Sequence, residues 1–225
     1  MTRESLDHKL QMLADELKVM AGMVETATLG AVEALKNKDL VSAQQIYRAD
    51  QLINARRFEL ENDCIITIAT QQPIVARDLR RVASLLDVAS EMERMGDYAK
   101  GIARICLLIG DQPLIKPLID IPRMANQTVS MLHRAVTAFI DTDVEAARQI
   151  PNEDDEIDAL YNQVYRELVM IMLRDPSTID QANHLMWAAH NLERMADRVT
   201  NICERTIYVA TNEMREIDNS DDEII

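Results

Sequence analysis

The residues with the clearest chemical potential are pairs of carboxylates four positions apart. Glu93 and Asp97 stand in the run ERMGD, and Glu193 and Asp197 stand in the closely similar run ERMAD. On a helix, side chains at this spacing project from one face, one turn apart. Two such acids can flank one cation, and hard or borderline metal ions favour oxygen ligands. The repeated pair therefore indicates a cation or partner site.

A further pair, Asp154 and Asp158, has the same spacing. Its counterpart earlier in the chain keeps one acid, Asp50, and replaces the other by an amide, Asn54. Acid pairs of this form therefore recur in both parts of the chain, one of them incomplete.

Two other interpretations of these acids stay open. An oxidative or storage protein of the ferritin-like kind would use Glu-x-x-His ligands, and only His190, three residues before Glu193, approaches that pattern; its counterpart is Ser90. Alternatively, Arg94 and Arg194 pair with the acids at the surface of an unliganded helical scaffold, where such ion pairs contribute little.

One basic cluster stands out in the run ARDLRR, which contains Arg77, Arg80 and Arg81. Guanidinium groups in this arrangement could contact a phosphate or an acidic partner surface. The alternative is ordinary charge on the helix surface around Asp78.

Composition excludes several classes of protein. With 24 basic and 38 acidic residues the net charge is -14, which disfavours binding to nucleic acid and to anionic membranes. The apolar runs are too short to span a bilayer. There is no glycine-rich phosphate loop, no G-x-S-x-G motif and no paired Cys/His nucleophile. We therefore expect a cytoplasmic protein that is no enzyme, binds no nucleic acid and does not insert directly into a membrane.

The elements that must position the acids are helices. Only 5 glycines and 6 prolines occur in 225 residues, and such sparse breakers favour long helices over a sheet with frequent turns. Aromatic residues make up 4% of the chain and methionines number 13, which suits helix-on-helix packing. Flat helical bundles rich in methionine often pair, so a homodimer is a candidate, and the oligomeric state stays open. The breakers predict six long helices, at about 5–36, 40–70, 74–109, 119–140, 144–173 and 178–215, with a kink at Pro151 in the fifth.

The two halves of the chain correspond to each other. Glu93 to Asp97 match Glu193 to Asp197 at an offset of 100, whereas Asp39 matches Asp143 and Asp50 matches Asp154 at an offset of 104. The all-α fold class is therefore expected to be two tandem homologous three-helix bundles related by internal duplication. We expect one bundle at residues 1–112, the second at 113–215, and an acidic C-terminal tail at 216–225.

These segments resemble the PhoU family of phosphate-signalling proteins. The likeness rests on QPIVARDLR at 72–80, MERMGDYA at 92–99 and LERMADRVTNI at 192–202, together with the segments around Asp50 and Asp154. The resemblance implies a cytoplasmic adaptor that negatively regulates phosphate uptake and phosphate-starvation signalling. It also implies two partners, a phosphate ABC transporter ATPase and a sensor histidine kinase.

The resemblance further implies metal binding by the acidic motifs. Carried over to this chain, the candidate ligands are Asp50, Glu93, Asp97, Asp154, Asp158, Glu193 and Asp197. The ion could be iron, zinc or another divalent or trivalent cation. Because Asn54 departs from the motif, the site near Asp50 is expected to bind fewer ions or to bind them more weakly.

Overall fold

The computed structural model describes residues 3–71, 73–214 and 217, and long helices account for nearly all of them. The elements are α1 (Arg3–Asn37), α2 (Leu40–Thr70), α3 (Ala76–Ile109), α4 (Asp120–Asp141), α5 (Val144–Gln149), the short 3₁₀ helix η1 (Ile150–Glu153), α6 (Asp154–Arg174), a second 3₁₀ helix η2 (Pro176–Thr178) and α7 (Ile179–Thr211). No strand occurs in these ranges, so the prediction of an all-α fold is confirmed.

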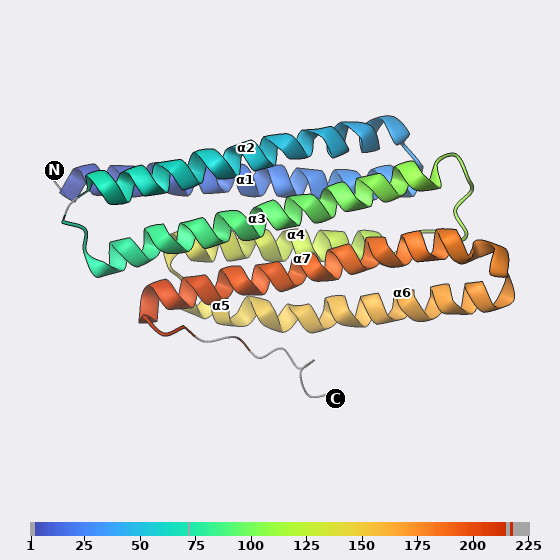
Figure 1. Cartoon of the computed structure of the whole chain (residues 1–225). Helices are drawn as coiled ribbons and strands as arrows, with labels where there is room; N and C mark the ends of the chain where they lie inside the picture. Colours follow the sequence, from blue (N-terminus) through green and yellow to red (C-terminus); the bar gives the residue numbers. More distant parts are fainter. Residues whose placement is uncertain (1–2, 72, 215–216, 218–225) are drawn as a thin grey trace.

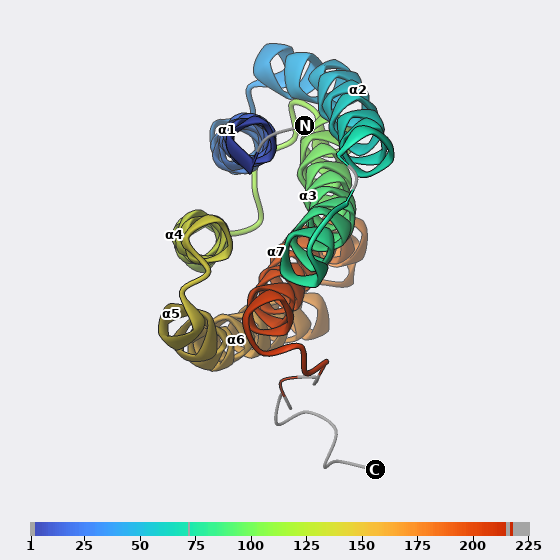
Figure 2. The same ribbon diagram turned by 90° about the vertical axis from the view of Figure 1, so that its left-hand side faces the viewer.

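The helices run along one common axis and form two bundles side by side (Figure 1). α1, α2 and α3 pack on one another, and α4, α6 and α7 pack likewise. The bundles meet where α3 contacts α7 and α1 contacts α4, as the end-on view in Figure 2 shows. The predicted pair of three-helix bundles is therefore present, although its exact residue boundaries stay a prediction. The predicted acidic tail at 216–225 lies outside the described residues except for Ile217.

The fifth predicted helix is interrupted, so the expectation of a single kinked helix at 144–173 was only partly right. α5 ends at Gln149, η1 follows with Pro151 in its first turn, and α6 begins at Asp154. Proline has no backbone N–H and disrupts a continuing α-helix. The interruption places Asp154 in the first turn of α6.

The turn between the first two helices of each bundle has the same backbone arrangement. Lys38 and Thr142 adopt left-handed backbone conformations with φ of 56° and 57°. Asp39 and Asp143 then cap the next helix, each accepting hydrogen bonds from the backbone N–H groups two and three residues on. The backbone N–H of each aspartate donates to the carbonyl five residues earlier at 2.8 Å. Such matching turns support the internal duplication.

α3 and α7 run in opposite directions in Figure 1, and we call the interface between them the seam. Equivalent residues of the two halves make equivalent contacts across it. The Oε2 atom of Glu91 accepts from Arg198 Nη1 at 3.4 Å, and Asn191, the counterpart of Glu91, donates to the carbonyl of Tyr98 at 3.5 Å. Tyr98 is itself the counterpart of Arg198. The halves are therefore related by an approximate twofold axis, and both acidic motifs lie beside it.

Candidate functional site

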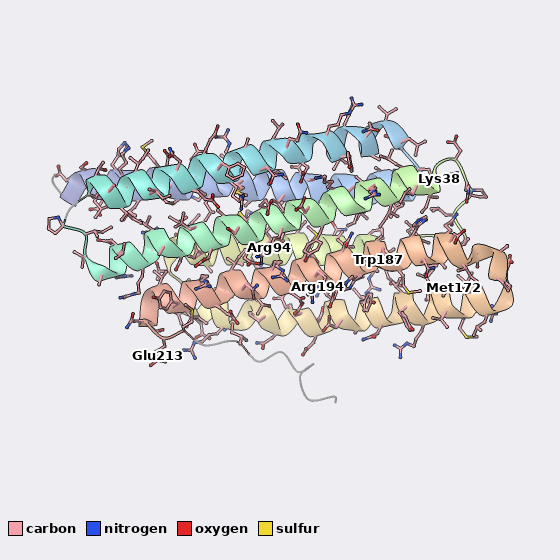
Figure 3. The ribbon with its side chains drawn as sticks, in the orientation of Figure 1. Lys38, Arg94, Met172, Trp187, Arg194 and Glu213 are labelled. Atoms are coloured by element: carbon pink, nitrogen blue, oxygen red, sulfur yellow. The ribbon has the colours of Figure 1, made fainter. Side chains whose placement is uncertain are left out.

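Two clusters of charged side chains form beside the seam, one in each bundle. The first-half cluster is Asp50 from α2 with Glu93, Asp97 and Lys100 from α3. The second-half cluster is Asp154 and Asp158 from α6 with Glu193 and Asp197 from α7. Arg94 and Arg194, which belong to the two acidic motifs, mark these positions near mid-helix in Figure 3.

The first-half cluster contains its own counter-ion. Asp50 is 4% exposed, and its Oδ2 atom accepts hydrogen bonds from Lys100 Nζ at 2.7 Å and from Asn54 Nδ2 at 3.2 Å. Lys100 Nζ also lies 3.5 Å from Asp97 Oδ1. The hydrogen bond to Asp50 is the main reason why the pKa of Lys100 is raised, so this ammonium group stays charged between the two carboxylates.

Glu93 stands at the edge of the same cluster. Burial is the main cause that raises the pKa of Glu93, followed by the charge of Asp97; Arg57 opposes the shift and Asp50 adds to it. The side chain of Asp97 is 53% exposed. The first half thus brings together all three of its predicted ligands, but with Lys100 and Arg57 among them.

The second-half cluster has less positive charge beside it. Asp154 is also 4% exposed. Burial raises the pKa of Asp154 to about 7, and the charges of Asp158, Asp197 and Glu193 add to the effect in that order. All four predicted ligands of this half therefore lie close enough to repel one another.

The difference follows from two substitutions between the repeats. The position equivalent to Lys100 holds Thr200, which is buried, and the position equivalent to Arg57 holds Tyr161. A positive group is present in Arg194, whose Nη1 atom donates to Asp197 Oδ2 at 2.9 Å. In the first half the equivalent Arg94 donates to Glu91 Oε1 at 3.2 Å. The predicted pairing of the motif arginine with the motif aspartate is therefore seen in the second half.

His190 lies next to one acid of the second-half cluster. Its Nδ1 atom is 3.2 Å from Glu193 Oε2, and its ring centroid is 5.8 Å from that of Trp187 and 6.1 Å from that of Tyr161. Burial, aided by Arg194, lowers the pKa of His190, which favours the neutral imidazole. A single histidine beside a single glutamate does not reproduce the Glu-x-x-His pairs of di-iron bundles.

The fit of a metal ion differs between the clusters. Within the described part of the chain, no group of three or more His, Cys, Asp or Glu side chains has the arrangement that would hold a metal ion. The acidic side chains would therefore have to rotate to bind a shared ion. The second-half cluster suits a cation because its carboxylates repel one another. The first-half cluster suits one less well, since Lys100 already bridges Asp50 and Asp97.

The arginines of the basic cluster at the start of α3 differ in their surroundings. Arg81 Nη2 donates to the carbonyl of Ile140 at 2.8 Å, tying α3 to the C-terminal end of α4. Its burial lowers the pKa of the Arg81 guanidinium. Arg77 is exposed and Arg80 is half-buried. Arg81 therefore has a structural contact that the sequence pattern did not indicate, and partner binding by these arginines stays a prediction.

No described helix is both long enough and apolar enough to cross a membrane. The three cysteines are buried free thiols, and burial raises the pKa of Cys64 and of Cys203 to about 12. These thiols are poor nucleophiles, because the thiolate is the reactive form.

Comparison with known proteins identifies relatives along the whole chain. The family model described as PhoU domain matches twice, at residues 17–106 and 121–206. A protein of Clostridium acetobutylicum named phosphate-specific transport system accessory protein PhoU homolog is 34% identical over 98% of this chain and 100% of its own length. A protein of the same name from Deinococcus radiodurans is 36% identical over 93% of this chain and 98% of its own length. The crystal structure of the phosphate transport system regulatory protein PhoU from Streptococcus pneumoniae superposes with a TM-score of 0.86 at 30% identity, covering 94% of this chain and 100% of that one.

Proposed function

The chain belongs to the PhoU family, and from that premise we propose that it is a cytoplasmic adaptor that represses phosphate uptake and phosphate-starvation signalling. Its relatives are named as accessory and regulatory proteins of phosphate transport, so an accessory, non-enzymatic role follows from the family. The finer proposal is that the chain, as a homodimer, contacts the ATPase of a phosphate ABC transporter and a sensor histidine kinase. The exposed Arg77, on the surface at the start of α3, is a candidate contact.

The regulatory proposal is tested in a strain that lacks this protein. We expect phosphate uptake and starvation-gene expression to stay high in phosphate-rich medium, and expression of the wild-type chain to restore repression. Unchanged uptake and gene expression in the deletion strain would contradict the proposal. Co-purification with the transporter ATPase, compared between wild type and Arg77→Glu, tests the proposed contact separately.

We further propose that the chain binds a divalent or trivalent metal ion, such as iron or zinc, mainly through Asp154, Asp158, Glu193 and Asp197. The observation that carries this proposal is the gathering of Asp158, Glu193 and Asp197 around the buried Asp154, whose pKa is raised to about 7 by burial and by the charges of these neighbours. When bound, the ion would neutralise this charge, and the chain's own acids would hold it at the surface between α6 and α7. Asp50, Glu93 and Asp97 would bind an ion more weakly, because it would have to displace Lys100.

The metal proposal is tested by titrating chelator-treated protein with Zn²⁺, Mn²⁺ and Fe²⁺ in a calorimeter, with metal content measured after dialysis. Glu193→Gln/Asp197→Asn is expected to weaken binding at least tenfold. The matched variant Glu93→Gln/Asp97→Asn, at the equivalent positions, is expected to weaken it much less. Wild-type protein that retains no metal, or equal losses in the two variants, would contradict the proposal without affecting the regulatory one.

A further inference from the structure

An apolar cavity opens between α1 and α2 in the first bundle, apart from the second-half acids that the metal proposal mainly uses. Its volume is about 390 Å³, within the range of small-molecule sites. Val19 and Leu52 line it although they are 48% and 62% exposed. At Gly22, in its wall, no atom of a neighbouring element lies within 4 Å of the place where a Cβ would stand. The absence of a side chain at Gly22 therefore helps to keep the cavity open.

The cavity is closed at both ends along the helices. At one end Arg56 Nη1 donates to Glu16 Oε2 at 2.9 Å. At the other end α1 and α2 approach so closely that a Cβ on Gly30 would lie 3.1 Å from Ile46 Cδ1. The closed ends and the volume of about 390 Å³ together suit a small molecule.

The second bundle shows that the fold does not require this opening. The positions equivalent to Val19, Gly22, Met23, Ala49 and Leu52 are all polar, namely Arg123, Asn126, Gln127, Glu153 and Glu156.

Two of these polar residues join the helices in the second bundle. Gln127 Nε2 donates to Glu156 Oε2 at 2.8 Å, linking α4 to α6. Equivalent pairs of helices are thus joined by polar side chains in one half and border an apolar cavity in the other. An apolar surface kept open in only one copy of the repeat is a feature of this half and not of the scaffold.

The polar groups at the cavity decide which ligand suits it. Asp50 and Lys100 line it as a hydrogen-bonded ion pair. Glu93 and Asp97 stand nearby, with Arg57 and Arg94 as further cations. The positive and negative charges around the cavity therefore balance, and burying an additional ion in an apolar space is costly. We propose that the cavity binds a small apolar molecule, of the size of a ten-carbon chain, that carries a neutral polar end.

The test uses decanol, decylamine and decanoate as probes, titrated into the full-length protein by calorimetry below their micelle-forming concentrations. Decanol is expected to bind one molecule per chain with saturation, and decylamine and decanoate at least fivefold more weakly. Gly22→Leu is expected to weaken decanol binding at least tenfold while raising the melting temperature, because leucine fills the space and favours the helix more than glycine does.

A second variant copies the other half of the molecule. Met23→Gln/Leu52→Glu installs the pair that joins α4 to α6 and is also expected to weaken decanol binding at least tenfold. The matched control Ile65→Glu removes an equally exposed apolar side chain of α2 outside the cavity and is expected to leave binding unchanged. The proposal is overturned if folded Gly22→Leu, verified by circular dichroism, binds decanol like wild type, or if Ile65→Glu loses as much affinity. Equal affinity for decylamine or decanoate would overturn the assigned ligand class.

Discussion

Asp50 and Asp154 occupy equivalent places in the two bundles and are equally buried, but their charges are balanced in different ways. Asp50 has a lysine at 2.7 Å from its Oδ2 atom. For Asp154, burial raises the pKa most, and the charges of four further carboxylates add to the shift. The duplicated scaffold therefore retains the position of the buried acid but changes its charged neighbours. Two differences between the repeats, Lys100 against Thr200 and Arg57 against Tyr161, separate a cluster in which a lysine pairs with the buried acid from one in which carboxylates shift its pKa.

Exchanging Lys100 and Thr200 is expected to give the largest effect. Lys100→Thr leaves Asp50 buried without its ammonium partner. Because the lysine side chain is 31% exposed, the cost is expected to be about 2 kcal/mol, below that of breaking a fully buried pair. We expect the free energy of unfolding in chelator to fall by about that amount in urea denaturation. Added Zn²⁺ should recover part of the loss, because the first half then resembles the second.

The reverse exchange, Thr200→Lys, sharpens the comparison. Its ammonium group is expected to neutralise the second-half cluster and to lower metal affinity at least tenfold in calorimetry. Thr200→Val serves as the control for filling this buried position without charge. If Lys100→Thr were as stable as wild type in chelator, the lysine could not be the counter-ion that distinguishes the halves.

The pH dependence of stability gives the next largest contrast. Since Asp154 has a pKa raised from 3.8 to about 7, the folded state holds its proton more tightly than the unfolded state does. The stabilising contribution of protonated Asp154 to the free energy of unfolding is fully present below about pH 4 and is lost as the pH rises through 7. Between pH 5 and pH 8, metal-free wild type should lose on the order of 2 kcal/mol of unfolding free energy from this group.

The matched pair Asp154→Asn and Asp50→Asn isolates that contribution. Asp154→Asn should abolish the loss between pH 5 and pH 8 and be more stable than wild type at pH 8. Asp50→Asn should instead be less stable than wild type, because it breaks the ion pair with Lys100. Denaturation curves at several pH values check both outcomes. If Asp154→Asn still loses unfolding free energy between pH 5 and pH 8, that loss arises from other groups.

The sequence predicted the helices, the duplication and the acids well, because these depend on local spacing. Glu93 and Asp97 share a face of one helix whatever that helix packs against. Lys100 was missed because its main partner, Asp50, belongs to another helix, and the register between α2 and α3 cannot be obtained from periodicity. A signal did exist, since the repeats differ there by Lys100 and Thr200. The cavity at Gly22 was missed for a similar reason, because it depends on how α1 packs against α2.

A smaller difference is expected at the seam between the bundles. Glu91 receives hydrogen bonds from Arg198 at 3.4 Å and from Asn201 at 3.2 Å, whereas its counterpart Asn191 makes one long bond to Tyr98 at 3.5 Å. Bonds to a charged group contribute more than neutral ones. Glu91→Ala should therefore destabilise the protein by about 1 kcal/mol more than Asn191→Ala, as measured by urea denaturation. Equal losses would mean that the ionic contacts at the seam are screened by solvent.

The two capped turns should show the smallest difference between the halves. Asp39 and Asp143 each accept backbone hydrogen bonds at 3.1 and 3.0 Å, and Asp39 alone also accepts one from the Ser42 hydroxyl at 2.6 Å, because the equivalent residue is Ala146. Asp39→Ala and Asp143→Ala each remove one cap, so both should lower the melting temperature in calorimetry, Asp39→Ala by slightly more. Asp39→Asn and Asp143→Asn, which retain a capping oxygen, should restore most of the loss. Because cap geometry depends on the scaffold and not on the charge clusters, a larger loss in Asp143→Ala would show that the halves differ in stability as well as in chemistry.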